Sequence, residues 1–169
     1  MFHKLEEKSI AAITSEWDAL AHVRLRQICS GKDLTFKHFL APNILRLARN
    51  ETAETIVDAG CGVGVLTSLL ARQDSTVIGI DPSVESIGIA RTHFGKTAQF
   101  FESTLEAFTQ RHDSDTDLVI ANMVLMNVLN LRAFVTAAHR ILRPGGALIF
   151  SISHPCFWPF YYGYAQEPW

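Results

Sequence analysis

The chain has 169 residues, of which 48% are hydrophobic and 19% are charged, a composition typical of one folded domain and unlike that of disordered or fibrous proteins. Its formal net charge is −2, so we expect no nucleic-acid partner. The three cysteines are widely spaced, which favours neither a disulfide framework nor a metal site. No signal peptide or membrane span is predicted, because the longest apolar stretch (residues 117–131) is short and contains asparagines. We expect a soluble, cytoplasmic protein.

The N-terminal part is predicted to be helical. Apolar residues recur at intervals of three and four over residues 10–28, as on one face of a helix. A second short helix is expected over residues 42–49, with Pro42 near its start. We interpret residues 1–50 as a helical cap on a single domain that occupies residues 1–169.

Residues 51–155 alternate between short β-rich runs and helical stretches. Strands are predicted at 55–59, 76–80, 98–101, 117–123 and 147–153, and helices at 65–71, 83–94, 105–110 and 131–142, the last ended by Pro144–Gly146. This alternation implies right-handed crossovers and a doubly wound, mostly parallel α/β sheet of the Rossmann-like class. Residues 156–169 form an aromatic C-terminal segment that either walls an apolar substrate pocket or covers the core.

The first turn from strand to helix contains Gly60, Gly62 and Gly64. Ligands of open parallel sheets bind outside the carboxyl ends of the strands, and glycines there let the backbone approach a ligand closely. A dinucleotide fingerprint would place its third glycine three residues after the second, where this chain has Val65. The spacing therefore disfavours a nicotinamide dinucleotide.

Two carboxylates sharpen this prediction. Asp58 lies in the strand just before the glycines, where its charge would repel a pyrophosphate and attract an ammonium or sulfonium group. Asp81 ends the second strand, at the place of a carboxylate that accepts hydrogen bonds from ribose hydroxyls, in either kind of cofactor site.

The segments "VDAGCGVG", "GIDPS" and "HRILRPGGALIFSISHP" resemble, in that order, the cofactor loop, the ribose-binding strand end and the entry to the fifth strand of class I S-adenosylmethionine-dependent methyltransferases. The resemblance covers about Thr55 to Pro155. It implies S-adenosylmethionine as the cofactor and methyl transfer to a small-molecule acceptor. The alternatives are a non-catalytic binding module of the same fold and, further away, an NAD-dependent oxidoreductase.

The resemblance also implies which residues border the cofactor. Asp58 would order the loop or reach the amino group through water, and Asp81 would bind the ribose. Thr104 stands where the family often has an acidic residue near the adenine. The implied cofactor-binding residues are Asp58, Gly60, Cys61, Gly62, Gly64, Asp81, Pro82, Ser103, Thr104, Leu105, Asn122 and Met123.

Several of these residues also have purely structural interpretations. Gly64 could serve helix packing alone, Cys61 could be a small filler, and Thr104 could be a helix cap. No catalytic residue is identified; His154 is a weak candidate for a base, because its neighbour Pro155 favours a chain-turning role equally.

The end of the chain carries a further expectation. Members of the family usually add a sixth and a seventh strand, for which no room is left after the fifth strand. The predicted sheet order is therefore 3-2-1-4-5, with the fifth strand as an outer edge. We expect self-association or the C-terminal segment to cover that edge.

Overall fold

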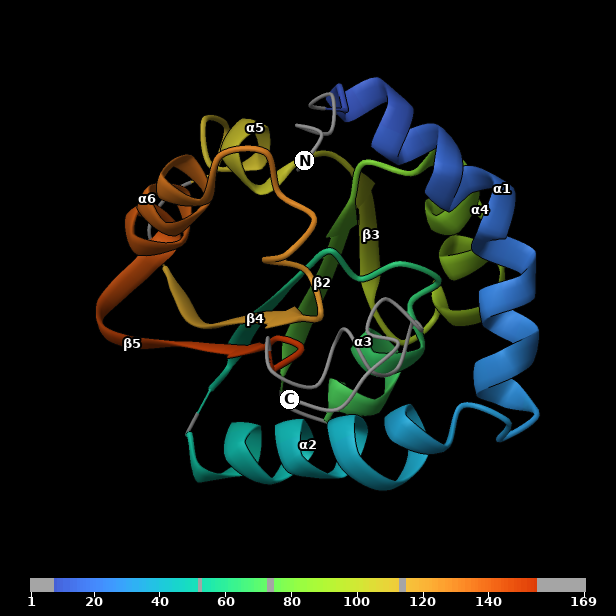
Figure 1. Ribbon diagram of the computed structural model, residues 1–169. Helices are drawn as coiled ribbons and strands as arrows, with labels where there is room; N and C mark the ends of the chain where they lie inside the picture. The colour runs from blue at the N-terminus through green and yellow to red at the C-terminus, as the bar shows by residue number, and fades with distance from the viewer. Residues whose placement is uncertain (1–7, 52, 73–74, 113–114, 155–169) are drawn as a thin grey trace, which may run out of the picture.

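The computed structural model describes residues 8–51, 53–72, 75–112 and 115–154. Their centre is one five-stranded parallel sheet in the order β3-β2-β1-β4-β5 (Figure 1). The predicted order and the Rossmann-like α/β class are confirmed. The strands are β1 (Thr55–Ala59), β2 (Thr76–Asp81), β3 (Gln99–Glu102), β4 (Thr116–Asn122) and β5 (Leu142–Ser151).

Helices precede the sheet and connect its strands. The first begins after Ser9, whose side chain accepts a hydrogen bond from the Ala12 amide, a favourable N-cap. The helical elements are α1 (Ile10–Cys29), the π-helix η1 (Phe36–Leu40), α2 (Ala41–Asn50), α3 (Val65–Leu70), α4 (Val84–Phe94), α5 (Leu105–Phe108) and α6 (Leu131–Ile141). The one clear omission from the sequence prediction is η1, which continues directly into α2.

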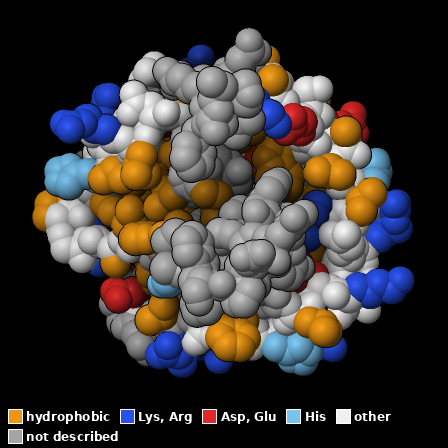
Figure 2. Space-filling model, in the orientation of Figure 1, with side chains coloured by type: hydrophobic (Ala, Val, Ile, Leu, Met, Phe, Trp, Pro, Cys, Tyr) orange, Lys and Arg blue, Asp and Glu red, His pale blue; other side chains and the backbone are white. Residues whose placement is uncertain are grey.

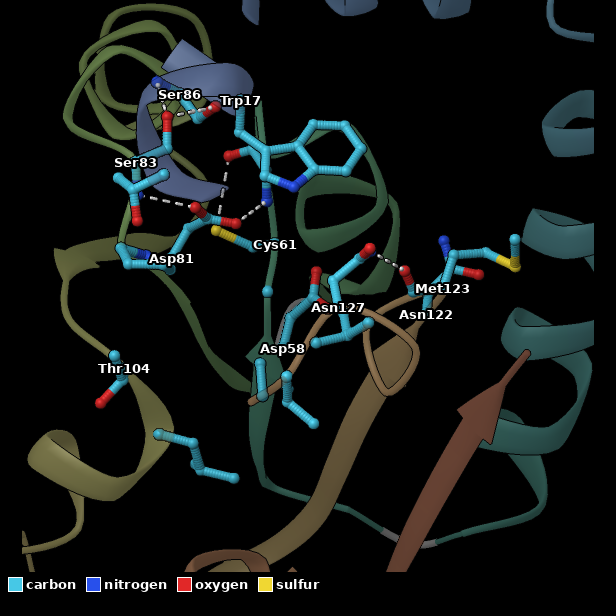
Figure 3. Close-up of a pocket in the computed structure, with 18 of the residues that line it drawn as sticks. Trp17, Asp58, Cys61, Asp81, Ser83, Ser86, Thr104, Asn122, Met123 and Asn127 are labelled. Atoms are coloured by element: carbon cyan, nitrogen blue, oxygen red, sulfur yellow. Dashed lines mark hydrogen bonds between the residues drawn. The ribbon is translucent and has the colours of Figure 1, made fainter. Parts of the chain in front are cut away.

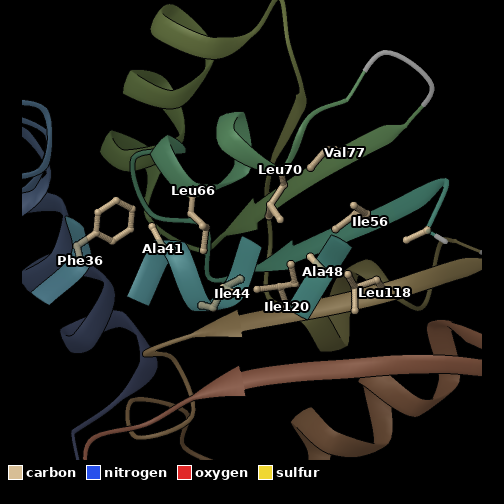
Figure 4. Packing of buried hydrophobic residues seen from close by; sticks show 11 residues of the cluster. Phe36, Ala41, Ile44, Ala48, Ile56, Leu66, Leu70, Val77, Leu118 and Ile120 are labelled. Atoms are coloured by element: carbon tan, nitrogen blue, oxygen red, sulfur yellow. The ribbon is translucent and has the colours of Figure 1, made fainter. Parts of the chain in front are cut away.

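Each strand places alternate side chains on opposite faces of the sheet. Ile56 of β1 faces a cluster with η1, α2 and α3, whereas its neighbour Val57 faces a cluster with α5 and α6. Figure 4 shows the first cluster, in which helix and strand side chains interdigitate. Its buried members are Phe36, Ala41, Ile44, Ala48, Ala53, Ile56, Leu66, Leu70, Val77, Leu118 and Ile120.

The expectation that Pro144–Gly146 ends the last helix is wrong. Helix α6 ends at Ile141, because Leu142 is already extended and pairs with Thr116 of β4. The next pair joins Leu118 to Ala147, so the proline and glycines occupy an irregularity at the start of β5. They redirect a strand there and do not stop a helix.

Among the described residues the fifth strand is an edge of the sheet, as predicted. Within the described residues it pairs only with β4, and Phe150 and Ile152 are 52% and 53% exposed. The expected C-terminal segment, and with it the question of further strands or of a cover for this edge, falls outside the described residues. Among the helices that are described, none has the length and apolar character to cross a membrane.

Candidate functional site

The carboxyl ends of β1, β2 and β4 open into a cavity of about 510 Å³. Side chains of α1, of η1 and of the loops after β1, β2, β3 and β4 line it (Figure 3). The structure brings eleven of the twelve predicted site residues to this cavity: Asp58, Gly60, Cys61, Gly62, Asp81, Pro82, Ser103, Thr104, Leu105, Asn122 and Met123. Gly64 is not among the lining residues.

The three glycines of the turn have different surroundings. A Cβ at Gly60 would lie 2.4 Å from Val124 Cγ2, and one at Gly64 would lie 2.8 Å from Ala90 Cβ. These two glycines therefore permit close packing of the protein against itself. Gly62 has a φ of +52°, and a Cβ there would meet nothing within 4 Å. It is the glycine that leaves open space beside the loop, a place that suits a closely approaching ligand.

Asp81 connects the end of β2 with the glycine turn. Its Oδ2 accepts the Gly62 amide at 2.9 Å and its Oδ1 accepts the Ser83 amide at 2.8 Å. Burial raises the pKa of this carboxyl above its ordinary value, the two amides oppose the rise, and the nearby Asp18 adds to it. Each oxygen keeps a lone pair for a further donor. The carboxylate is thus held in place by the backbone while it lines the cavity.

Asp58 is 1% exposed and accepts a 2.7 Å hydrogen bond from Thr67 Oγ1. Desolvation by burial raises the pKa of this carboxyl to about 7, Thr67 opposes the rise, and the charge of Asp81 adds to it. The carboxyls of Asp58 and Asp81 therefore lie at the same end of the cavity, close enough for their charges to interact. A cationic ligand group would relieve the unfavourable charge that they place there.

Two other predicted residues have mainly structural contacts. Cys61 packs in an apolar cluster with Ile87 and Phe100, and burial raises the pKa of its thiol well above the ordinary value, so it is no activated thiolate. Thr104 caps α5 by accepting a hydrogen bond from the Ala107 amide. In the structure the Cys61 side chain therefore fills a small space in the core, and the Thr104 side chain caps a helix.

The end of β4 is fixed to the edge strand. Met123 adopts a φ of +60°, rare for a residue with a side chain. Its amide donates to the carbonyl oxygen and to Oγ of Ser151, at 3.1 and 3.0 Å, and Ser151 Oγ donates to Asn122 Oδ1 at 2.8 Å. This small network holds the chain in a strained conformation beside the cavity, a pattern common at functional sites.

Helix α1 supplies a part of the site that sequence reasoning missed. Trp17 lines the cavity and Figure 3 shows its indole beside the loop that carries Cys61. The adjacent Asp18 accepts hydrogen bonds from Ser83 Oγ at 2.5 Å and from the Glu85 amide at 3.2 Å. The only sequence signal was a Trp on the apolar face of a helix expected to cap the core.

The candidate base and the possibility of a metal site remain to be considered. His154 follows β5 and is exposed, and its role as a base stays a prediction. No group of three or more His, Cys, Asp or Glu side chains that could hold a metal ion occurs in the described parts of the chain.

Comparison with known proteins agrees with this geometry. A family described as a methyltransferase domain matches residues 33–161. The chain is 33% identical, over 125 residues, to the mitochondrial ubiquinone biosynthesis O-methyltransferase of Rattus norvegicus, a match that spans 67% of this chain and 36% of that protein. It is 36% identical to the ubiquinone biosynthesis O-methyltransferase of Agrobacterium fabrum, across 55% of this chain and 38% of the relative. The chain thus spans little more than a third of the length of these relatives.

A solved structure gives the same fold. The magnesium protoporphyrin IX methyltransferase of Synechocystis PCC 6803, determined with bound S-adenosylmethionine, superposes with a TM-score of 0.67. The match covers 90% of this chain and 80% of that one at 20% identity. At this identity the likeness shows the shared fold.

Proposed function

Because the chain belongs to this family of methyltransferase domains, we propose that it binds S-adenosylmethionine and takes part in methyl transfer to a small-molecule acceptor. The observation that carries the proposal is Asp81, held by the Gly62 and Ser83 amides at the rim of a cavity beside the open face of Gly62. When bound, S-adenosylmethionine supplies an electrophilic methyl carbon on a cationic sulfonium.

The residues at this end of the cavity fit such a ligand. Asp81 would accept the ribose hydroxyls with the lone pairs that Gly62 and Ser83 leave. The open space beside Gly62 would admit the methionine part close to the backbone. The side chain of Asp58 is only 1% exposed, so it would make little direct contact with the ligand. Its role would be to order the loop and to offset the positive charge of the ligand.

The adenine would lie near the start of α5. Ser103 Oγ donates to the Thr104 carbonyl, and the Thr104 hydroxyl accepts the Ala107 amide. The Leu105 amide lies in the first turn of α5, where backbone donors lack partners within the helix. We therefore favour this backbone donor for the adenine edge, in the place of the acidic side chain that the family often has.

The chemistry asks little of protein acids and bases. An in-line displacement at a methyl carbon needs mainly a nucleophile held close to it in the right orientation, and positioning supplies much of such a rate gain. Asn122 and Met123 at the end of β4 would border both the cofactor and the acceptor. His154 stays a weak candidate for a base.

The test is calorimetry of the purified chain with S-adenosylhomocysteine and with NAD. The proposal expects binding of S-adenosylhomocysteine alone. Binding of NAD alone would overturn it in favour of a dehydrogenase. Binding of S-adenosylhomocysteine without turnover of any acceptor would favour the non-catalytic alternative.

We propose further that the exposed edge of β5 pairs with a second copy of the chain. Phe150 and Ile152 are apolar and half exposed beside this edge, which has no second partner strand among the described residues, and such edges readily recruit other strands. Light scattering would detect a dimer that Phe150→Lys weakens, and a strictly monomeric chain would contradict the idea.

We also propose, as expected from the sequence, that the chain forms a single domain and is located in the cytoplasm.

A further inference from the structure

Helix α1 contributes a wall to the cavity that differs from the sheet side. Five of its seven lining residues are apolar, among them Ile13 and Trp17, although Trp17 is 41% exposed. The apolar surface continues onto Phe36 and Leu40 of η1. Figure 2 shows hydrophobic side chains on both sides of the centre of this view, the larger group on the side of α6 and β5 and a smaller one toward α1. An apolar concave surface of this kind is typical of a small-molecule site.

This wall is fixed in place by two kinds of contact. Asp18, next to Trp17, accepts hydrogen bonds from Ser83 Oγ and the Glu85 amide at the start of α4. One turn further, Ala21 is 1% exposed and packs in a cluster with Val63 and Ile89. The side chains that α1 turns toward the cavity are therefore part of a defined surface.

The wall offers no unpaired charge. Its one charged lining residue is Arg24, whose guanidinium pairs with Asp33 Oδ2 at 3.1 Å and donates to Gln27 Oε1 at 3.0 Å. The remaining polar residue of α1 in the lining is Thr14, which is neutral. A charged group placed against this surface would lose hydration without gaining a partner.

Across the cavity, the end of β4 supplies neutral hydrogen-bonding groups. Asn122 and Asn127 both line the cavity with carboxamides, which donate and accept hydrogen bonds. The carboxyls of Asp58 and Asp81 add negative charge at the cofactor end. This negative charge would repel an anionic acceptor. A cationic acceptor would find the position beside these carboxyls already occupied by the sulfonium of the cofactor.

We propose that the α1 wall selects an uncharged acceptor with an apolar, aromatic body. The body would lie against Ile13 and the indole of Trp17, and the reacting heteroatom would face Asn122 and Asn127. This inference rests on the proposed function, because it assigns the acceptor of the same site.

The test uses three catechols of similar size whose short side arms are neutral, cationic and anionic: 4-ethylcatechol, dopamine and 3,4-dihydroxyphenylacetate. Their affinities are measured by calorimetry with and without saturating S-adenosylhomocysteine. We expect 4-ethylcatechol to bind at least about tenfold more tightly than either charged probe, because only the charged arms must be desolvated without a partner. Equal affinities, or a preference for a charged probe, would overturn the inference.

Variants on one helix supply matched controls. Ile13→Lys places a cation in the wall and should shift the preference toward 3,4-dihydroxyphenylacetate. Leu20→Lys adds the same charge at a residue that is 46% exposed and outside the cavity lining, and should leave the order of affinities unchanged. Trp17→Ala should weaken 4-ethylcatechol binding by about fivefold or more through lost aromatic contact. Circular dichroism checks that each variant folds. If Ile13→Lys does not fold, the effect of Trp17→Ala on 4-ethylcatechol affinity decides the test.

The two proposals can fail separately. If S-adenosylhomocysteine does not bind but the neutral probe is still preferred, the cofactor assignment fails and the character of the wall stands. If S-adenosylhomocysteine binds and neither Ile13→Lys nor Trp17→Ala changes the probe affinities, the wall is not the acceptor site and this inference fails alone.

Discussion

The sheet side and the α1 side of the cavity are held by different kinds of contact. On the sheet side, Asp81 accepts two backbone amides and the buried Asp58 accepts a hydroxyl, so the polar groups are fixed by short hydrogen bonds. On the α1 side the surface is apolar, and one carboxylate, Asp18, makes the described polar contacts to α4.

This difference teaches where specificity for each ligand resides. The cofactor side needs particular residues at particular places, because hydrogen bonds and close backbone approach are directional. The α1 side needs only apolar surface of a suitable shape, which many sequences can supply. Changes on the sheet side should therefore be the more costly ones.

The largest expected effect comes from the glycine turn. In Gly60→Ala the new methyl group would lie 2.4 Å from Val124 Cγ2 at a φ of +78°. Overpacking and the left-handed backbone together should cost roughly 2 to 5 kcal/mol of unfolding free energy. Urea denaturation measures the loss.

Gly62→Ala is the matched control. Its φ is +52°, but the methyl group would enter open space, so only the backbone cost of roughly 1 to 2 kcal/mol remains. We expect this variant to lose affinity for S-adenosylhomocysteine more than stability. Equal stability losses in both variants would show that the packing of Gly60 against Val124 is unimportant.

The second prediction concerns pH. The pKa of Asp58 is about 7 in the folded protein against an ordinary value of 3.8, so the folded state binds more protons between these values. Stability from this group is complete below about pH 4 and is lost as the pH rises through about 7. We expect a loss of roughly 2 to 4 kcal/mol across that window. Denaturation of the ligand-free chain from pH 4.5 to 7.5 measures it.

Asp58→Asn should flatten this dependence, because the amide keeps an acceptor for Thr67 and carries no charge. Asp117 provides a contrast at the other end of the sheet. Hydrogen bonds from the Thr55 amide and Arg143 lower the pKa of that carboxyl, so its contribution is present above the ordinary value and is lost at lower pH. Asp81, whose pKa burial also raises, adds a slope of the same sign that Asp58→Asn leaves in place. A slope that Asp58→Asn does not reduce would exclude Asp58 as a source.

The fold was largely predictable because its pattern is local. Alternation of apolar runs placed β1 at its observed bounds and β2, β3 and β4 within one residue. Right-handed crossovers implied a parallel sheet, and the order of its strands came with the family resemblance. The start of β5 was not predictable in this way, because Pro144–Gly146 usually mark a helix end. Here pairing of Leu142 with Thr116 overrides that local preference.

The site was predictable only on its sheet side. The glycine spacing and the two aspartates stand close to strand ends, so their meeting at one cavity follows from the sheet. Trp17 reaches the same cavity from 41 residues upstream of Asp58, through packing of α1 on α4 and the hydrogen bonds of its neighbour Asp18. No local pattern encodes that contact, which arises only when the whole fold is formed.

The third prediction returns to the cofactor end. Asp81→Ala removes the charged acceptor proposed for the ribose, and loss of a charge-assisted hydrogen bond costs about 1.5 to 3 kcal/mol. Affinity for S-adenosylhomocysteine should fall roughly tenfold to a hundredfold or more. Calorimetry measures it, with Asp117→Ala as a control remote from the cavity. An unchanged dissociation constant in a folded Asp81→Ala protein would remove Asp81 from the site.

The smallest expected effect tests the hold on α1. Asp18→Ala removes the acceptor for Ser83 Oγ and the Glu85 amide, a loss of about 1 kcal/mol. Because the sheet does not depend on this contact, amide hydrogen exchange should quicken in α1 and stay unchanged in β1. Glu16→Ala, which removes an exposed pair between α1 and Lys8 just before it, should change neither. Equal acceleration in α1 and β1 would mean that the helix and the sheet open as one unit, and that the two sides of the cavity are not independently held.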